Sequence, residues 1–304
     1  MSGTAELAPR IGRQAGAHVN APSDEGTWST DPYAHALNTG QGPLFLRRAD
    51  GWLLLLEIER WCAEPDAADL EVLRRCEGPV LDIGCGPGRL VAALSRQNEA
   101  RYGSAPPLRG AGNCATSHDG AADDRQPIAP LPAERSVLGI DVSEAAITRT
   151  IARGASALHR SVFDPLPAEG RWGTALLIDG NIGIGGEPRI LLDRIAQLLV
   201  PGGLLIAETV PAPDVDERVL VHVTDARGAA GHAFPWARLG TPALLRHAHR
   251  TGWRAVDQWT AGGRCFVALR SRSRNSTAEP PNSTAVSSSQ RARKRSADRP
   301  VADA

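Results

Sequence analysis

Three glycines at alternate positions separate two apolar patterns in GPVLDIGCGPGRLVAAL, residues 78–94. The short apolar run before them is typical of a strand in a parallel sheet, which is buried on both faces. The pattern after them has the spacing of a helix. Because glycine has no Cβ atom, Gly84, Gly86 and Gly88 permit a tight turn and let a ligand approach the backbone closely. This feature therefore predicts a strand, a binding loop and a helix in succession.

The same alternation of strand and helix patterns continues along the chain. Strands are predicted at 79–84, 136–141, 157–164, 172–180 and 204–209. Helices are predicted at 66–76, 88–97, 143–154, 187–203 and 241–252. The expected N-caps are Asp66, Ser143 and Thr241, with Gly252 at the end of the last helix. Such alternation favours an α/β fold: a Rossmann-like, doubly wound, mostly parallel sheet in a three-layer α/β/α architecture.

Three further segments have the pattern of β-hairpins. Residues 44–58 contain Asp50-Gly51 between two apolar runs, and Asp-Gly is a favoured hairpin turn. A second hairpin is expected within 217–238. A third surrounds Ala261-Gly262-Gly263 and makes the C-terminal strand antiparallel to its neighbour. We expect the first two hairpins to be accessory to the main sheet and to shape a substrate pocket.

Other segments lack the periodicity of a folded core. Residues 1–27 and 271–304 contain few apolar side chains and are predicted to be disordered tails. Residues 98–133 are rich in Gly, Ala and Pro, which predicts a disordered insertion, with a functional lid as the alternative. Residues 28–270 are then left for one large domain.

Composition excludes several function classes. The formal net charge is zero, so the core gives no reason to expect nucleic acid, although RARKR at 291–295 could contact an anionic partner. The five cysteines form neither C-x-x-C pairs nor clusters with His, so neither a disulfide framework nor a metal site is predicted. No apolar run approaches the ~18 residues of a membrane span. We therefore expect a cytoplasmic protein without a membrane partner, and the oligomeric state stays open.

The glycine loop alone is compatible with two classes of cofactor. A dinucleotide fingerprint, G-x-G-x-x-G, would require glycine at positions 84, 86 and 89. Position 89 is Arg, and the third glycine comes one residue earlier, at Gly88. Arg89 could still offset the charge of a phosphate, so the loop by itself does not decide between a phosphate-containing ligand and another one.

The segments LDIGCGPG, LGIDVS and FDPLP together resemble the class I S-adenosylmethionine-dependent methyltransferases over about residues 66–270. In that family an acidic residue precedes a G-x-G-x-G loop that packs against the amino-acid and ribose parts of the cofactor. The resemblance assigns these roles to Asp82, Gly84, Cys85, Gly86 and Gly88. Within the loop, Cys85 is interpreted as a small filler and not as a nucleophile.

The resemblance also implies how the rest of the cofactor is held. Asp141, at the end of the second strand, would accept hydrogen bonds from both ribose hydroxyls, and Val142 would pack on the adenine. Asp164 would accept the adenine amino group, with Phe163 beside it. Asp82 would repel a pyrophosphate but attract the ammonium of S-adenosylmethionine, which carries no phosphate.

The spacing between the loop and Asp141 departs from the usual pattern. The second acid normally lies about 20 residues past the glycine loop, whereas Gly88 and Asp141 are 53 positions apart. Removing the 36 residues of the expected insertion, 98–133, leaves 17. The insertion therefore accounts for the difference.

Candidate catalytic residues follow the fourth and fifth strands. Asp179 and Asn181 lie in IDGNIGIGGEP, at the edge where the methyl group is expected, and Asp179 is also a candidate cofactor ligand. A general base is required only if the acceptor loses a proton early. The candidates for a base are Glu208, His222 and His232. The tryptophans expected to wall the substrate pocket, one in each accessory hairpin, are Trp52 and Trp236.

The resemblance implies methyl transfer from S-adenosylmethionine to a small-molecule acceptor that the sequence does not identify. Two alternatives stay open. One is an NAD(P)-dependent oxidoreductase, although Lys294 is the only lysine and a lysine-dependent dehydrogenase is nearly excluded. The other is a non-catalytic cofactor-binding or scaffolding protein that uses the basic tail as its contact.

Overall fold

The computed structural model describes residues 31–102, 136–228 and 230–271. The predicted N-terminal tail, positions 103–133 of the predicted insertion, and the C-terminal tail beyond Ser271 lie outside the described residues.

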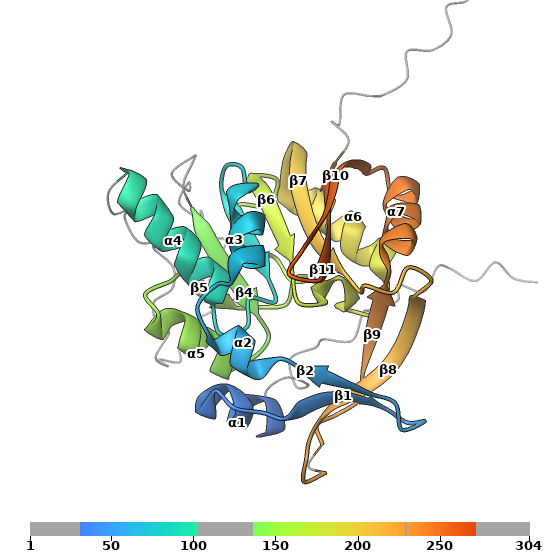
Figure 1. Cartoon of the computed structure of the whole chain (residues 1–304). Helices are drawn as coiled ribbons and strands as arrows, with labels where there is room; N and C mark the ends of the chain where they lie inside the picture. The colour runs from blue at the N-terminus through green and yellow to red at the C-terminus, as the bar shows by residue number, and fades with distance from the viewer. Residues whose placement is uncertain (1–30, 103–135, 229, 272–304) are drawn as a thin grey trace, which may run out of the picture. The chain divides into compact units, whose positions relative to one another are not determined.

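A seven-stranded sheet with the order β10-β11-β7-β6-β3-β4-β5 forms the centre of the fold (Figure 1). The strands β3 to β7 pair in parallel, whereas β11 pairs antiparallel with both β7 and β10. Their bounds are β3 (Val80–Ile83), β4 (Val137–Asp141), β5 (Ala157–His159), β6 (Trp172–Leu177), β7 (Leu199–Thr209), β10 (Arg254–Ala261) and β11 (Arg264–Arg270). The expected doubly wound sheet with an antiparallel C-terminal strand is confirmed.

Helices cover both faces of this sheet (Figure 1). They are α3 (Ala67–Arg74), α4 (Arg89–Tyr102), α5 (Glu144–Ala152), α6 (Pro188–Leu198) and α7 (Thr241–Arg250). Consecutive side chains of a strand point to opposite faces. Accordingly Leu81 belongs to the apolar cluster with α6 and α7, whereas Val80 belongs to the cluster with α3, α4 and α5. None of the described helices is long and apolar enough to cross a membrane.

The two accessory hairpins join into one four-stranded sheet with the order β2-β1-β8-β9. Its strands are β1 (Leu44–Arg48), β2 (Leu53–Leu56), β8 (Asp216–Asp225) and β9 (Phe234–Leu239). β1 and β8 pair antiparallel, with Leu44 opposite Asp225 and Arg48 opposite Val221. This accessory sheet shares an apolar cluster with α1 (Asp31–Thr39), a helix that the sequence patterns did not predict. Both hairpins were predicted, but their union was not.

Local signals located most helix starts correctly. Asp66 caps α3, accepting from the Asp69 amide at 2.8 Å while Asp69 returns the interaction in a capping box. Ser143 caps α5 through the Ala146 amide at 3.3 Å. The prediction for Thr241 is wrong: Gly240 occupies the N-cap position, and the Thr241 hydroxyl instead lies 2.8 Å from that of Thr209.

Several predicted boundaries differ from the structure, and three of them show why. The strand predicted at 157–164 ends at His159, because Ser161 and Asp164 form a turn in which the Asp164 amide donates to the Ser161 carbonyl at 3.2 Å. β7 begins five residues earlier than predicted, at Leu199, because Pro201-Gly202-Gly203 lies within the strand and does not precede it. α4 continues to Tyr102, five residues into the predicted insertion.

Candidate cofactor and acceptor site

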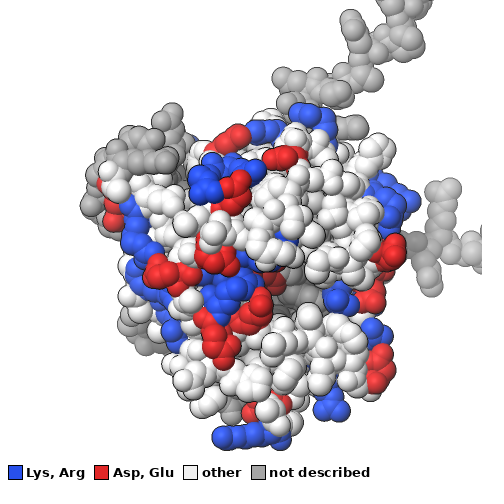
Figure 2. Space-filling model, in the orientation of Figure 1, with Lys and Arg blue, Asp and Glu red and all other residues white. Residues whose placement is uncertain are grey.

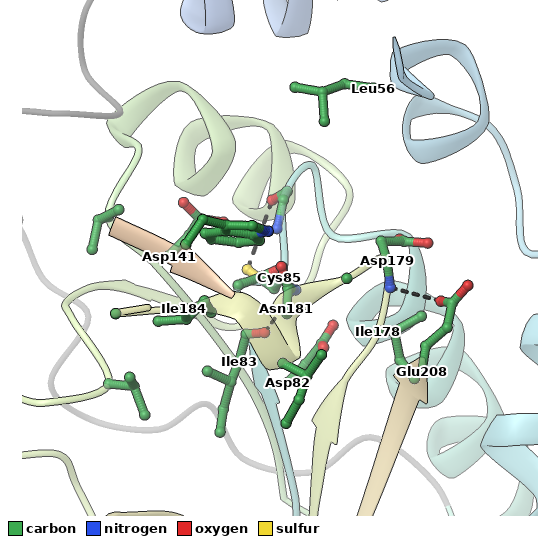
Figure 3. Close-up of a pocket in the computed structure, with 18 of the residues that line it drawn as sticks. Leu56, Asp82, Ile83, Cys85, Asp141, Ile178, Asp179, Asn181, Ile184 and Glu208 are labelled. Carbon is green, nitrogen blue, oxygen red and sulfur yellow. Dashed lines mark hydrogen bonds between the residues drawn. The ribbon is translucent and has the colours of Figure 1, made fainter. Parts of the chain in front are cut away.

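A pocket lies at the carboxyl ends of β3, β4 and β6, where ligands of open α/β sheets bind (Figure 3). The glycine loop and the segments after β4 and β6 form its floor. The inner side of the accessory sheet forms its roof, with Leu46, Leu56 and Trp236 among the lining residues. Tyr33 of α1 lines it as well. The tertiary structure thus brings stretches that are far apart in the sequence to one cavity.

Asp141 ties the end of β4 to the glycine loop. Its Oδ2 accepts from the Gly86 amide at 2.9 Å, and its Oδ1 accepts from the Ser143 amide at 2.8 Å. Burial raises the pKa of this carboxyl group, and hydrogen bonds from the amides of Ser143, Gly86 and Val142, with the charge of His159, counteract part of that effect. A carboxylate has more lone pairs than these amides occupy, and Asp141 also lines the pocket. Val142 follows it in the lining.

The three glycines of the loop serve different purposes, although all have positive φ: +70° at Gly84, +54° at Gly86 and +80° at Gly88. A Cβ atom on Gly88 would lie 2.5 Å from the Thr150 hydroxyl. On Gly86 its nearest neighbour would be the Tyr33 hydroxyl, 3.9 Å away. Gly88 is therefore required by the packing of the protein itself, whereas Gly86 leaves space that a ligand can occupy.

Asn181 holds the loop from the other side. Its Nδ2 donates to the carbonyls of Ile83 at 2.9 Å and Gly84 at 2.8 Å. A Cβ atom on Gly84 would lie 2.6 Å from the same nitrogen, so Gly84 is required for this contact. Although Asn181 lines the pocket (Figure 3), both of its amide hydrogens are engaged. Asn181, a candidate catalytic residue, thus fixes the position of the glycine loop.

Asp82 lines the pocket and is only 2% exposed. Its carboxylate forms no hydrogen bond or ion pair with another described residue, in contrast to the other lining carboxylates. Burial, together with the nearby charge of Asp179, raises its pKa to about 7. An uncompensated buried carboxylate that faces a cavity is suited to a positively charged ligand group.

Two further lining residues are protonated polar groups. Burial raises the pKa of the Cys85 thiol well above its ordinary value, and its Sγ lies 3.9 Å from the Thr150 hydroxyl. A thiol held protonated is a poor nucleophile, which agrees with the interpretation of Cys85 as a filler. Burial, with the charge of Asp141 beside it, also raises the pKa of Tyr33, so this hydroxyl remains a hydrogen-bond donor.

The expected adenine ligands do not line the pocket. The Oδ2 of Asp164 accepts from the Ser161 amide at 3.2 Å within the turn after β5. The ring of Phe163 faces Gly185, where a Cβ atom would come within 2.8 Å of it. Ser161 and Val162 line the cavity instead. The adenine roles of Asp164 and Phe163 stay a prediction, since an Asp-Pro pair in sequence does not reveal which side chain closes the turn.

Asp179 is engaged by three guanidinium groups. Its Oδ1 accepts from Arg60 at 2.7 Å and from Arg264 at 3.1 Å, and its Oδ2 accepts from Arg89 at 2.9 Å. Its backbone has a φ of +58°, and its amide donates to Glu208 at 2.7 Å (Figure 3). A carboxylate whose oxygens are occupied in this way is poorly placed to accept a proton or to bind a cofactor ammonium.

The same arginines bind further acids. Arg264 forms a bidentate pair with Glu208, at 2.9 and 2.7 Å. It also lies 2.8 Å from Asp69, a fully buried residue that pairs with Arg89 at 3.0 Å. We call the residues Arg60, Arg89, Arg264, Asp69, Asp179 and Glu208 the charge cluster. Arg60 also pairs with Glu57 at 2.6 Å, and Arg264 lies 3.7 Å from Asp66. Figure 2 shows charges of both signs mixed on the visible face around α2 (Ile58–Cys62). Sequence reasoning missed the charge cluster because its members lie on six separate elements.

The remaining candidates divide between pocket and surface. Trp236 is 7% exposed and lines the pocket. Trp52 does not line it and lies under the Arg238 guanidinium, 4.6 Å away. Neither His222 nor His232 is among the lining residues, and His232 is exposed. The described residues contain no cluster of three or more His, Cys, Asp or Glu side chains placed to bind a metal ion.

No protein-family model matches the chain, and no curated protein matches it in sequence. Among solved structures, it is similar to a SAM-dependent methyltransferase from Bacteroides fragilis in complex with S-adenosyl-L-homocysteine. That similarity has a TM-score of 0.56 and 16% identity, and covers 79% of this chain and 92% of that chain. For the Burkholderia thailandensis 1,6-didemethyltoxoflavin-N1-methyltransferase the TM-score is 0.41 and the identity 16%, over 68% and 76% of the two chains. The chain therefore has the fold of class I SAM-dependent methyltransferases, as the sequence resemblance implied.

Proposed function

We propose that this protein binds S-adenosylmethionine and transfers its methyl group to a small-molecule acceptor. The observation that carries the proposal is the pairing of Asp82 and Asp141 around the glycine loop. Asp82 offers a buried carboxylate without a hydrogen-bond partner among the described residues, and Asp141 offers a carboxylate beside Gly86, where no side chain fills the space. The B. fragilis protein of the same fold was solved with S-adenosyl-L-homocysteine, which supports the choice of cofactor.

The residues present suit the charges of this cofactor. Asp82 would attract its ammonium, and Asp141 would accept hydrogen bonds from its ribose hydroxyls. Val142 and Ser161 would border the adenine, since both line the cavity next to Asp141. When bound, the cofactor supplies a methyl carbon that is already activated for attack, so the protein mainly has to bind, orient and exclude water.

The dinucleotide alternative is less compatible with the site. The sequence left open that Arg89 could offset the charge of a phosphate. In the structure Arg89 is only 3% exposed and is paired with Asp69 and Asp179. Because these two acids already balance its charge, Arg89 is not available to pair with a pyrophosphate. The buried carboxylate of Asp82 would in addition repel such a group.

Calorimetry tests the cofactor directly. We expect S-adenosylmethionine and S-adenosylhomocysteine to bind, and NAD and NADP to bind far more weakly or not at all. Binding of NAD alone would overturn the proposal. The acceptor can then be sought by incubating a metabolite extract with cofactor labelled in the methyl group, with the Asp141→Ala variant as the matched control. Labelled product that forms only with the wild type supports an enzyme over a scaffolding protein.

A further inference from the structure

The roof of the pocket is an apolar surface. The inner face of the accessory sheet contributes Leu46, Leu56, Phe234 and Trp236, all less than a tenth exposed although they line a cavity. Phe234 and Trp236 pack edge to face with their ring centroids 6.0 Å apart. Contact between such a surface and an apolar ligand group is favourable. A hydrated ligand group would lose its hydrogen bonds to water there without replacing them.

This roof is attached to the floor by backbone. An antiparallel bridge joins Ile184, in the loop after β6, to Trp236 of β9. Gly183 beside it lies so close that a Cβ atom would come 2.5 Å from the Trp236 indole. Ile184 and Val210 add apolar side walls. The space between roof and floor, which we call the chamber, is therefore fixed by backbone contacts and lined by residues that are far apart in sequence.

Charges around this chamber are matched within the protein. In the charge cluster each of the three arginines is paired with acids, and Glu57 and Asp66 pair with Arg60 and Arg264 at its edge. Arg238, in the roof, pairs with Glu217 at 2.9 Å and stacks on Trp52. Among the described lining residues, the charges without such pairing are Asp82 and Asp141, which we assign to the cofactor, and Arg160, which stands beside Ser161 at the adenine end. Against the roof, away from these three residues, a charged acceptor would lose hydration without finding an unpaired opposite charge.

The chamber also lacks a free base. Its described lining contains neither His nor Lys. Of its four lining acids, Asp179 and Glu208 are bound by guanidinium groups, and Asp82 and Asp141 are the ones that we assign to the cofactor. Burial raises the pKa of Tyr33, so its hydroxyl stays protonated. General-base catalysis needs a group within hydrogen-bond reach that can take the proton. An acceptor atom bound here therefore has to attack the methyl carbon in the protonation state in which it binds.

From these two properties we infer the class of acceptor, resting on the proposed function. It is an uncharged, apolar, aromatic compound methylated on a nitrogen or sulfur atom that carries a lone pair and has no proton to lose. The lone pair forms the bond to the methyl carbon, and the carbon–sulfur bond of the donor breaks with its electron pair left on sulfur. No proton is released. The product is a cation, which the apolar chamber binds less well than the neutral acceptor.

Matched probes test this inference. Quinoline and thioanisole are neutral aromatic compounds with a nitrogen and a sulfur nucleophile, and each has a carboxylate derivative of nearly the same shape. Their binding to the protein saturated with S-adenosylhomocysteine is measured by calorimetry, and methyl transfer from the labelled cofactor is measured in parallel. We expect the neutral probes to bind roughly tenfold more tightly than the carboxylates, and quinoline to be methylated faster than naphthol, which must lose a proton.

Leu56 and Leu55 provide a pair of variants on one strand. Leu56 is 8% exposed and lines the chamber, whereas Leu55 is 56% exposed on the outer face. Leu56→Arg should shift the preference toward the carboxylates by roughly tenfold, and Leu55→Arg should leave it unchanged. Retained S-adenosylhomocysteine affinity shows that each variant is folded.

The possible outcomes distinguish failure of this inference from failure of the proposed function. Equal or tighter binding of the carboxylates, absence of binding by the neutral probes, or faster methylation of naphthol overturns this inference and leaves the proposed function standing, provided that S-adenosylhomocysteine binds. Loss of the preference in both leucine variants places the probes elsewhere and also overturns it. Failure of the wild type to bind S-adenosylhomocysteine overturns the proposed function, and the inference with it.

Discussion

The carboxylate of Asp141 accepts a hydrogen bond of 2.9 Å from the amide of Gly86, although the two residues are 55 positions apart. The second oxygen accepts from Ser143, at the start of α5. One side chain thus sets the position of the glycine loop relative to β4 and the helix after it. Any ligand that uses the free acceptor positions of Asp141 is held against Gly86, where the backbone is open to the pocket.

Replacement of Asp141 should weaken cofactor binding. Asp141→Ala removes the acceptors proposed for the ribose and loosens the loop, so we expect a loss of about 1–3 kcal/mol in the binding free energy of S-adenosylhomocysteine. Asp164→Ala is the control, because Asp164 lies in the turn after β5 and outside the pocket lining. Calorimetry on both variants checks the assignment. A loss for Asp164→Ala as large as that for Asp141→Ala would restore the original adenine role of Asp164.

The loop glycines should separate into packing and binding positions. Gly88→Ala places a Cβ atom 2.5 Å from the Thr150 hydroxyl, so the free energy of unfolding should fall by more than backbone strain alone explains. Gly86→Ala meets nothing closer than 3.9 Å and should cost only the strain of a positive φ, about 1 kcal/mol. Gly86→Ala should nevertheless reduce the affinity for S-adenosylhomocysteine, because the added methyl group enters the pocket.

Gly154 supplies the reference for this comparison. Its φ is +79°, and an added Cβ atom would meet no described atom within 4 Å, so Gly154→Ala reports backbone strain alone. Urea denaturation of the three alanine variants should give similar losses for positions 86 and 154 and a clearly larger one for position 88. Unchanged cofactor affinity in Gly86→Ala would argue against a ligand in contact with the loop at that point.

The charge cluster should contribute to stability through Arg264. Arg264→Met leaves Glu208, Asp69 and Asp179 with fewer cations, in surroundings where Asp69 is fully buried and Glu208 is 13% exposed. We expect the free energy of unfolding to fall by about 3 kcal/mol, the lower end for breaking a buried pair. Arg96→Met removes an exposed pair with Glu64 and should cost at most about 1 kcal/mol. Equal losses for the two variants in urea denaturation would mean that the cluster adds no stability beyond that of a surface pair.

Asp82 should make cofactor binding depend on pH. Its pKa is raised from 3.8 to about 7 by burial, and Asp179, Asp141 and Asp69 act in the same direction while Arg89 opposes them. A bound ammonium favours the ionised form, so binding below pH 7 requires loss of a proton. The affinity for S-adenosylhomocysteine should therefore rise with pH up to about 7 and level off there. Calorimetry at about pH 6 in buffers of different ionisation enthalpy should detect the released proton.

The Asp82→Asn variant serves as the control for this titration. It should bind S-adenosylhomocysteine more weakly above pH 7 and without proton release. The free protein has the opposite trend, because a carboxyl group with a raised pKa holds its proton better in the folded state and loses that stabilisation as pH rises through about 7. Asp82→Asn should thus be more stable than the wild type in mildly alkaline buffer without cofactor. A wild-type affinity that does not change with pH would assign the ammonium to another group.

Much of the fold was readable from the sequence because its signals are local. Strand and helix periodicities located the elements of the main sheet, and Asp66 and Ser143 marked helix starts through contacts three residues away. The glycine loop and Asp141 were identified in the same way, since each stands directly at the end of a strand. Predicted boundaries were wrong where a local signal had two interpretations. Pro201 was predicted to end a helix, but it lies inside β7.

The amino-acid sequence by itself determined the doubly wound sheet, the three hairpins and the position of the glycine loop, since hydrophobic periodicity and turn chemistry act over a few residues. Only the tertiary structure decided how these parts combine. The pairing of β1 with β8 turned two hairpins into one roof, and the meeting of six elements engaged Asp179 and Glu208 with arginines. Strand partners and ion pairs depend on which distant surfaces come into contact, and no local pattern records that choice.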